Sequence, residues 1–284
     1  MADIAAPTPP PGAAADWTID QGWDRYTPEE HQVWLTLYER QAELLRGRAC
    51  DAFLHGLDAL DLRGASQEGG SPRGGIPDLR RVNPALKALT GWTVVCVPGL
   101  VPDAVFFDHL ANRRFPAGQF IRRSDQLDYL QEPDIFHDLF GHVPMLTDPV
   151  FADYMCAYGR GGLRAQGLGQ LHHLARLYWY TVEFGLLATP DGLRIYGAGI
   201  VSSRAETLYS LEDPRPHRIA FDLERVMRTL YKIDDLQPAY FVAPSLQALL
   251  DTTLQDFGGL YDRLRAESDI DPGAVTPADA LVAA

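Results

Sequence analysis

The 284-residue sequence lacks several features that would assign it to particular protein classes. Its three cysteines, Cys50, Cys96 and Cys156, are odd in number and form no CxxC pair, so we expect no disulfide framework and a cytoplasmic location. The N-terminal residues lack a basic segment followed by an apolar run, so we expect no secretory signal, and no stretch approaches the roughly 18 apolar residues of a membrane span. GxGxxG and Walker sequences are also absent, which leaves a dinucleotide or P-loop fold without support.

Positive charge is scarce as well. The sequence has 25 Lys and Arg against 38 Asp and Glu, giving a net charge of −13 and a pI of about 5.0. Nucleic acids and anionic membranes favour clustered basic residues, so we predict neither as a partner.

The composition along the chain predicts one domain between two tails. Residues 1–16 are rich in Ala and Pro and are predicted to be disordered. Residues 17–264 are predicted to form a single domain, and residues 265–284 a C-terminal tail whose last ten or so residues fray. The Gly-rich stretch 64–75 predicts a loop. We do not interpret it as a domain boundary, because the segment before it is too small for an independent core.

The hydrophobic periodicity predicts a mainly α fold with short β-strands. The helix signals include a capping box at Thr27–Glu30. The predicted helices are 28–48, 50–60, 77–90, 104–111, 133–141, 149–158, 170–187, 207–210, 217–227 and 244–264. A Gly-rich break is expected at 159–169. Strands are predicted at 92–97 and 193–196, with 229–233 and 239–242 as a strand pair and 114–123 extended.

Two histidines and one glutamate stand out in apolar surroundings. His137 and His142 are five residues apart, which on an α-helix corresponds to about 140°, so the helix should end or distort near Gly141. Glu183 lies among aromatic residues, where a carboxylate is costly unless it is paired or bound to metal. This donor set suits ferrous iron with open coordination positions, whereas structural zinc takes four ligands.

The alternative for these residues is structural. Histidines near an apolar helix more often pack than bind metal, and composition and spacing leave this alternative open. The adjacent pair His172 and His173 is predicted to lie on the surface, because neighbouring helical residues point about 100° apart.

Several long runs resemble one known family. EPDIFHDLFGHVP, YWYTVEFGL, YGAGIVSS followed by Glu206, PDLRRVNPALKALTGW and LQPAYFVA are similar to segments of the pterin-dependent aromatic amino acid hydroxylases. The resemblance covers residues 17–264, which would then be a single catalytic domain. It implies that family's catalytic-domain fold, with iron in a basket-like cavity.

The resemblance also implies roles for individual residues. The iron ligands would be His137, His142 and Glu183, and Glu132 would be a catalytic acid near iron and pterin. The tetrahydropterin, either tetrahydrobiopterin or a bacterial analogue, would contact Gly99, Leu100, Val101, Asp103, Phe106, Asp138, Ala175 and Tyr178. The amino acid would contact Arg122, Leu130, Gln131, Trp179, Phe184, Gly199, Ser202 and Ser203. The sequence departs from animal members at Asp138, where they have glutamate, and at Leu130 and Gln131, where they have threonine and proline.

The implied activity is hydroxylation of L-phenylalanine to L-tyrosine by dioxygen, with iron(II) and a tetrahydropterin, as the first step of phenylalanine catabolism. Tyrosine or tryptophan hydroxylation is the alternative within the family. A zinc hydrolase or a non-catalytic binder is the alternative outside it. The chain is most similar to bacterial single-domain members, which implies a cytoplasmic monomer acting on small molecules.

Overall fold

The computed structural model describes residues 8–64, 74–128 and 132–283, and most of its regular structure is helical. The α-helices are α1 (Pro28–Leu45), α2 (Asp51–Ala59), α3 (Leu79–Thr90), α4 (Asp103–Ala111), α5 (Pro149–Gly167), α6 (Leu171–Tyr178), α7 (Ala198–Val201), α8 (Arg204–Glu212), α9 (Leu223–Arg228), α10 (Leu246–Thr252) and α11 (Phe257–Ala266). Short 3₁₀ segments are η1 (Trp23–Arg25) and η3 (Val143–Thr147), and π turns are η2 (His137–His142) and η4 (Trp179–Glu183). The mainly α prediction is confirmed.

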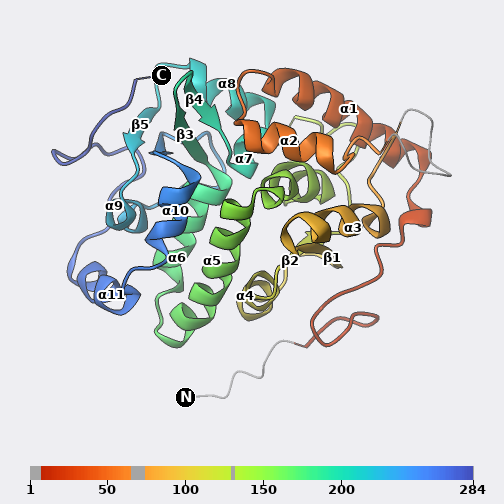
Figure 1. Cartoon of the computed structure of the whole chain (residues 1–284), viewed down its shortest axis with the longest axis horizontal. Helices are drawn as coiled ribbons and strands as arrows, with labels where there is room; N and C mark the ends of the chain where they lie inside the picture. The colour runs from red at the N-terminus through yellow and green to blue at the C-terminus, as the bar shows by residue number, and fades with distance from the viewer. Residues whose placement is uncertain (1–7, 65–73, 129–131, 284) are drawn as a thin grey trace.

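In the part of the chain that the structure describes, six short strands form two small sheets. The strands are β1 (Thr93–Val97), β2 (Arg114–Gly118), β3 (Gly185–Thr189), β4 (Gly192–Ile195), β5 (His217–Ala220) and β6 (Ala239–Ala243). Strands β1 and β2 pair in parallel, with Thr93 opposite Arg114. The second sheet has the order β4-β3-β6-β5, in which only β3 and β4 are antiparallel. Figure 1 shows α5 running between the two sheets, with β1 and β2 on the side of α3 and α4.

The predicted start of the first helix and the predicted end of the third are confirmed, whereas the first helix ends at Leu45 rather than at 48. Thr27 accepts a hydrogen bond from the Glu30 N–H while the Glu30 carboxylate accepts one from the Thr27 N–H, so the capping box opens α1. Helix α3 ends at Gly91, whose φ of 78° is the left-handed conformation that glycine adopts without strain.

The Gly-rich stretch 159–169 does not break α5, contrary to prediction. A Cβ on Gly159 would lie 2.4 Å from the backbone N of Ala111, and one on Gly162 would lie 2.0 Å from the Phe107 ring. These glycines let α4 approach α5 closely, so they serve packing inside the helix rather than termination.

Three predicted elements of the C-terminal half are wrong. Segment 217–227 begins as β5, and its helix starts only after Asp222, whose side chain caps α9. Segment 229–233 does not pair with β6, which lies between β3 and β5 instead. Segment 244–264 is two helices, because the Asp256 carboxylate accepts hydrogen bonds from Gly258 and Gly259 and starts α11.

The predicted helix 170–187 is also too long. It ends with η4 at Glu183, and β3 begins at Gly185. A Cβ at position 185 would clash with the Tyr196 side chain and the Thr181 carbonyl, so the close packing at this junction requires glycine. His173 on α6 is buried rather than on the surface, and burial lowers its pKa to about 4. Among the described residues no helix has the length and apolarity needed to cross a membrane.

The described parts of both tails contact the rest of the chain. At the N-terminal side the Asp16 carboxylate pairs with Arg114 at 3.0 Å, and the Asp16 carbonyl accepts from His109. The predicted disorder therefore does not hold at Asp16, and residues 1–7 lie outside the described residues.

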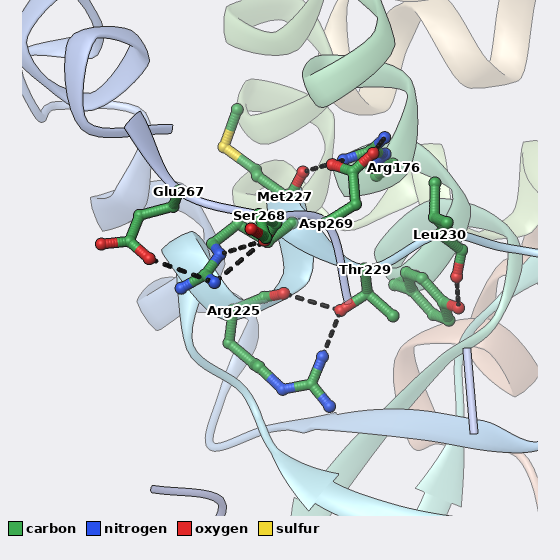
Figure 2. A network of polar contacts seen from close by, with 10 residues as sticks. Arg176, Arg225, Met227, Thr229, Leu230, Glu267, Ser268 and Asp269 are labelled. Atoms are coloured by element: carbon green, nitrogen blue, oxygen red, sulfur yellow. Dashed lines mark hydrogen bonds and ion pairs between the residues drawn. The ribbon is translucent and has the colours of Figure 1, made fainter. Parts of the chain in front are cut away.

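At the C-terminal side, Arg176 of α6 pairs with Asp269 at 2.7 Å and donates to the Met227 carbonyl (Figure 2). Arg225 of α9 pairs with Asp279 at 2.9 Å. The Val282 N–H donates to the Arg218 carbonyl at 2.8 Å, so the predicted fraying is wrong up to that residue. We call residues 267–282 the C-terminal clasp.

Candidate metal centre

His137, His142 and Glu183 converge on one point. The two histidine Nε2 atoms are 3.2 Å apart, and the Glu183 carboxylate oxygens lie 3.5 Å from His137 Nε2 and 3.2 Å from His142 Nε2. Adjacent ligands of an octahedral ion with bonds of about 2.1 Å are about 3.0 Å apart. The three side chains therefore fit a divalent ion bound on one face.

The π turns explain the spacing of these ligands. A π turn closes hydrogen bonds between residues five apart, so it places His137 and His142 over one another within η2. The predicted distortion is present, but it spans both histidines instead of interrupting the helix at Gly141. Gly141 instead allows close packing, because a Cβ added at this position would lie 3.0 Å from the Ala198 carbonyl oxygen of α7. Glu183 ends the second π turn.

Burial and mutual charge shift the pKa values of the ligands towards the metal-binding forms. Desolvation lowers the pKa of His137 to about 4, which leaves its imidazole neutral at pH 7. Burial alone would raise the pKa of Glu183, but the neighbouring His142 and His137 hold it below its usual value. A neutral imidazole and an ionised carboxylate are the forms that bind a metal.

A buried aspartate, Asp134, fixes the surroundings of His137. Its carboxylate accepts two hydrogen bonds from the Arg122 guanidinium, at 2.8 and 2.9 Å, and one from the His137 backbone N–H at 3.0 Å. Both Arg122 and Asp134 are buried. Asp134 was not predicted as a site residue from the sequence. The feature that could have indicated it is its position three residues before His137, separated from this ligand by the apolar pair Ile135 and Phe136.

The second ring nitrogen of His137 also has a partner. The Ser202 hydroxyl lies 3.0 Å from His137 Nδ1 and donates to the Ala198 carbonyl at 2.7 Å. Since the hydroxyl proton is used there, Ser202 accepts from Nδ1–H, which leaves Nε2 free to bind a metal. Ser203, by contrast, caps α8 by accepting from the Glu206 N–H.

A cavity of about 260 Å³ opens beside the three ligands. It brings together seven of the predicted pterin residues: Gly99, Leu100, Val101, Asp103, Phe106, Asp138 and Tyr178. Ala175 is not among its lining residues. Sequence reasoning missed five residues that complete the wall: Val97, Phe115, Pro116, Gly118 and Pro133.

Ring contacts and one carboxylate shape this cavity. Phe106 meets Tyr178 edge-on at 5.8 Å, and Phe115 packs on the His142 ring at 4.9 Å. The Asp138 carboxylate accepts from the Gly118 N–H at 2.7 Å, and burial raises its pKa to about 7.

Glu132 lies at the edge of this arrangement. Glu132 is exposed, and its Oε1 would be 3.8 Å from a Cβ placed on Gly99, so it lies at the rim beside the pterin residues. Leu130 and Gln131 lie outside the described residues.

Trp179 and Phe184 are in contact, with ring centroids 4.8 Å apart. Gly199 belongs to the same cluster, because a Cβ there would lie 2.8 Å from the Phe184 ring.

A larger cavity, of about 800 Å³, lies between the N-terminal arm, α3 and β1. It contains none of the candidate site residues. Several charged side chains on its wall pair with one another, as Asp16 does with Arg114 and Asp78 with Arg80. The smaller cavity beside the three ligands is therefore the candidate active site.

Comparison with known proteins agrees with this site. The family described as biopterin-dependent aromatic amino acid hydroxylase matches residues 23–264. A Caulobacter vibrioides phenylalanine-4-hydroxylase is 69% identical over 274 residues, covering 96% of this chain and 90% of that protein. The crystal structure of Chromobacterium violaceum phenylalanine hydroxylase bound to cobalt matches with a TM-score of 0.90 at 53% identity, covering 95% of this chain and 94% of the other. The structure of the same enzyme with bound oxidized Fe(III) matches with a TM-score of 0.89 at 53% identity and the same coverage.

Proposed function

We propose that this chain, which belongs to the biopterin-dependent aromatic amino acid hydroxylases, converts L-phenylalanine to L-tyrosine with dioxygen, iron(II) and a tetrahydropterin. This reaction would be the first step of phenylalanine catabolism. The observation that carries the proposal is the convergence of His137, His142 and Glu183 at the wall of a cavity that also contains the predicted pterin residues.

The protein's own groups have distinct tasks in this reaction. His137, His142 and Glu183 would hold the iron and leave its other face open. When bound, ferrous iron and reduced pterin supply the electrons that activate dioxygen for attack on an aromatic ring. Phe115 and Tyr178, which pack against the His142 ring, exclude water from that side.

Phe106 offers its ring for stacking on the pterin, and Asp138 offers a carboxylate that the Gly118 N–H already orients. Glu132 at the rim would contact the pterin edge that faces the metal. Gly99, Leu100, Val101, Asp103 and Tyr178 would form the rest of the pterin surface, with Ala175 behind Tyr178 on α6.

Arg122 would hold the substrate carboxylate. Its Nε and Nη2 are committed to Asp134, whereas Nη1 lies only within 3.4 Å of the Leu127 carbonyl and is the least committed donor. Trp179, Phe184 and Gly199 would surround the aromatic ring, and Ser202 and Ser203 would close the pocket behind it. Leu130 and Gln131 are proposed contacts from the resemblance alone.

We propose further that residues 17–264 are one catalytic domain and that the protein is a cytoplasmic monomer. The acidic composition supports small-molecule partners and disfavours nucleic acid or a membrane surface.

Turnover of protein purified without oxygen and reloaded with Fe(II) tests this function. We expect tyrosine to form from phenylalanine only with both iron and tetrahydropterin, and faster than products form from tyrosine or tryptophan. Preference for tyrosine or tryptophan would correct the substrate. Product formation with zinc and without pterin, or no product in any combination, would refute the hydroxylase function.

A further inference from the structure

The indole N–H of Trp179 ends on a buried glutamine from another part of the chain. Trp179 Nε1 donates to Gln237 Oε1 at 2.9 Å. The indole also stacks on Tyr231, with ring centroids 4.4 Å apart and planes within 17°, and makes a tilted contact with Phe184, with ring centroids 4.8 Å apart. The indole is therefore held by two aromatic contacts and by one hydrogen bond to an amide.

The orientation of this amide is determined by its surroundings. Gln237 Nε2 donates to the Lys232 carbonyl at 2.9 Å and to the Asp235 carbonyl at 3.2 Å. The reversed amide would place NH₂ against the indole N–H and oxygen against two carbonyls, so only one orientation satisfies every partner. Gln237 is 1% exposed, so water cannot replace a lost partner.

A buried carboxylate fixes the backbone of Gln237. Its N–H donates to Glu206 Oε1 at 3.1 Å, and the same oxygen accepts from the Tyr240 hydroxyl. Glu206 is 4% exposed, and burial raises its pKa. A continuous chain of hydrogen bonds thus runs from Tyr240 through Glu206 and Gln237 to the indole.

This chain reaches the element that carries the third metal ligand. Trp179 begins η4 and Glu183 ends it, and the Phe184 N–H donates to the Trp179 carbonyl at 2.8 Å. The indole is therefore attached to the same π turn as Glu183, and turning it would change the surroundings of that turn without replacing a ligand.

We propose that Gln237 is a positioning residue that fixes the Trp179 indole and thereby sets the affinity for the aromatic side chain of the substrate. This inference rests on the proposed function, in which Trp179 contacts that side chain. Glu206 and Tyr240 support the same task by holding the Gln237 backbone.

A double-mutant cycle tests the inference. Gln237→Leu keeps the volume but removes the acceptor, and we expect the calorimetric Kd for phenylalanine to rise about fivefold to tenfold, as loss of one buried hydrogen bond predicts. KM for phenylalanine should rise in parallel, while iron content and KM for the pterin stay unchanged. In a Trp179→Phe background, which has no indole N–H, the same substitution should change the Kd less than about twofold.

The matched control is Gln247→Leu, since Gln247 is an exposed glutamine on α10. An equal effect of Gln237→Leu in both backgrounds, or an unchanged Kd, would overturn the inference. If the leucine variant does not fold, Gln237→Asn takes its place in the test. Asparagine keeps the polar amide but is one methylene shorter, so the amide no longer reaches the indole. An unchanged Kd for phenylalanine in this variant also overturns the inference. The Kd needs no turnover, so an inactive wild-type protein would refute the proposed function without deciding this one.

Discussion

The proposed pterin side and the proposed amino-acid side of the metal centre are stabilised by different interactions. The pterin side is an open cavity whose shape comes from ring packing, as between Phe106 and Tyr178, and from the loop after β1. The proposed amino-acid side depends on two polar pairs, Arg122 with Asp134 and Trp179 with Gln237. Of these four side chains only Trp179 is half-buried, and the others are buried from water. A buried polar group that loses its partner has no substitute, so substitutions on the amino-acid side should have larger and more strongly coupled effects.

Removing a ligand common to both sides should have the largest effect. Glu183→Ala is expected to lower iron affinity by about a hundredfold or more and to abolish turnover. Removing a residue that only hydrogen-bonds to a metal ligand already lowers metal affinity by about tenfold to a hundredfold, so removing a ligand itself should cost at least as much. Metal analysis after dialysis and a tyrosine assay measure both. Glu43→Ala, on the exposed face of α1, is the control. Wild-type iron content and activity in the Glu183 variant would contradict the ligand assignment.

On the amino-acid side, Asp134→Ala should destabilise the fold by about 3–5 kcal/mol, because it leaves the Arg122 guanidinium buried without its partner. Denaturant unfolding measures the loss. KM for phenylalanine should rise more than KM for the pterin. Asp125→Ala, which removes the exposed partner of Arg123, should leave both quantities unchanged. If both substitutions changed stability and KM equally, burial of the Arg122–Asp134 pair would not be what makes it important.

On the pterin side, Phe106→Leu should raise KM for the pterin about fivefold to tenfold, the range expected for one aromatic contact. KM for phenylalanine and the free energy of unfolding should change little, because the cavity wall can adjust. Steady-state kinetics with each substrate varied in turn measures this. Phe120→Leu, at a half-exposed ring away from the cavity, is the control. A larger rise in KM for phenylalanine than in KM for the pterin would contradict the assignment of Phe106 to the pterin side.

The smallest effect is expected at the C-terminal clasp. Asp269→Asn should cost about 1 kcal/mol or less at pH 7, since the carboxylate is half-exposed and its pairing with Arg176 is screened by solvent. The pKa of Asp269 is lowered, chiefly by its hydrogen bond to Arg176. The stabilisation is therefore present above the ordinary carboxyl pKa and is lost as the pH falls through the lowered value.

Urea unfolding of wild type and variant from pH 7 down to about pH 3 tests this dependence. The two curves should approach each other as the pH falls below the ordinary carboxyl pKa of about 3.9. A difference that does not shrink over this range would mean that the aspartate stabilises the clasp by something other than its charge.

Local sequence signals predicted what depends on neighbouring residues. Thr27 with Glu30, and Gly91 after α3, specify their ends through contacts within one turn. A carboxylate and two imidazoles among apolar residues made His137, His142 and Glu183 candidate ligands, but the pattern left a structural role open, and only the resemblance to the hydroxylases favoured metal binding.

What the sequence did not reveal depends on distant partners. The glycines of α5 look like breakers until α4 packs against them, and Asp134 looks like a helix-start residue until Arg122 folds back onto it. The spacing of five between His137 and His142 was read against an α-helix, and no local signal announced a π turn.

The clasp has a consequence for the order in which the chain matures during synthesis. Arg176, three residues before the helix turn that ends in Glu183, and Arg225 both stay without their aspartate partners until residues 269 and 279 have left the ribosome. The histidine pair is translated well before residues 269 and 279, so the nascent protein can bring its two imidazoles together before the scaffold behind its carboxylate ligand is complete.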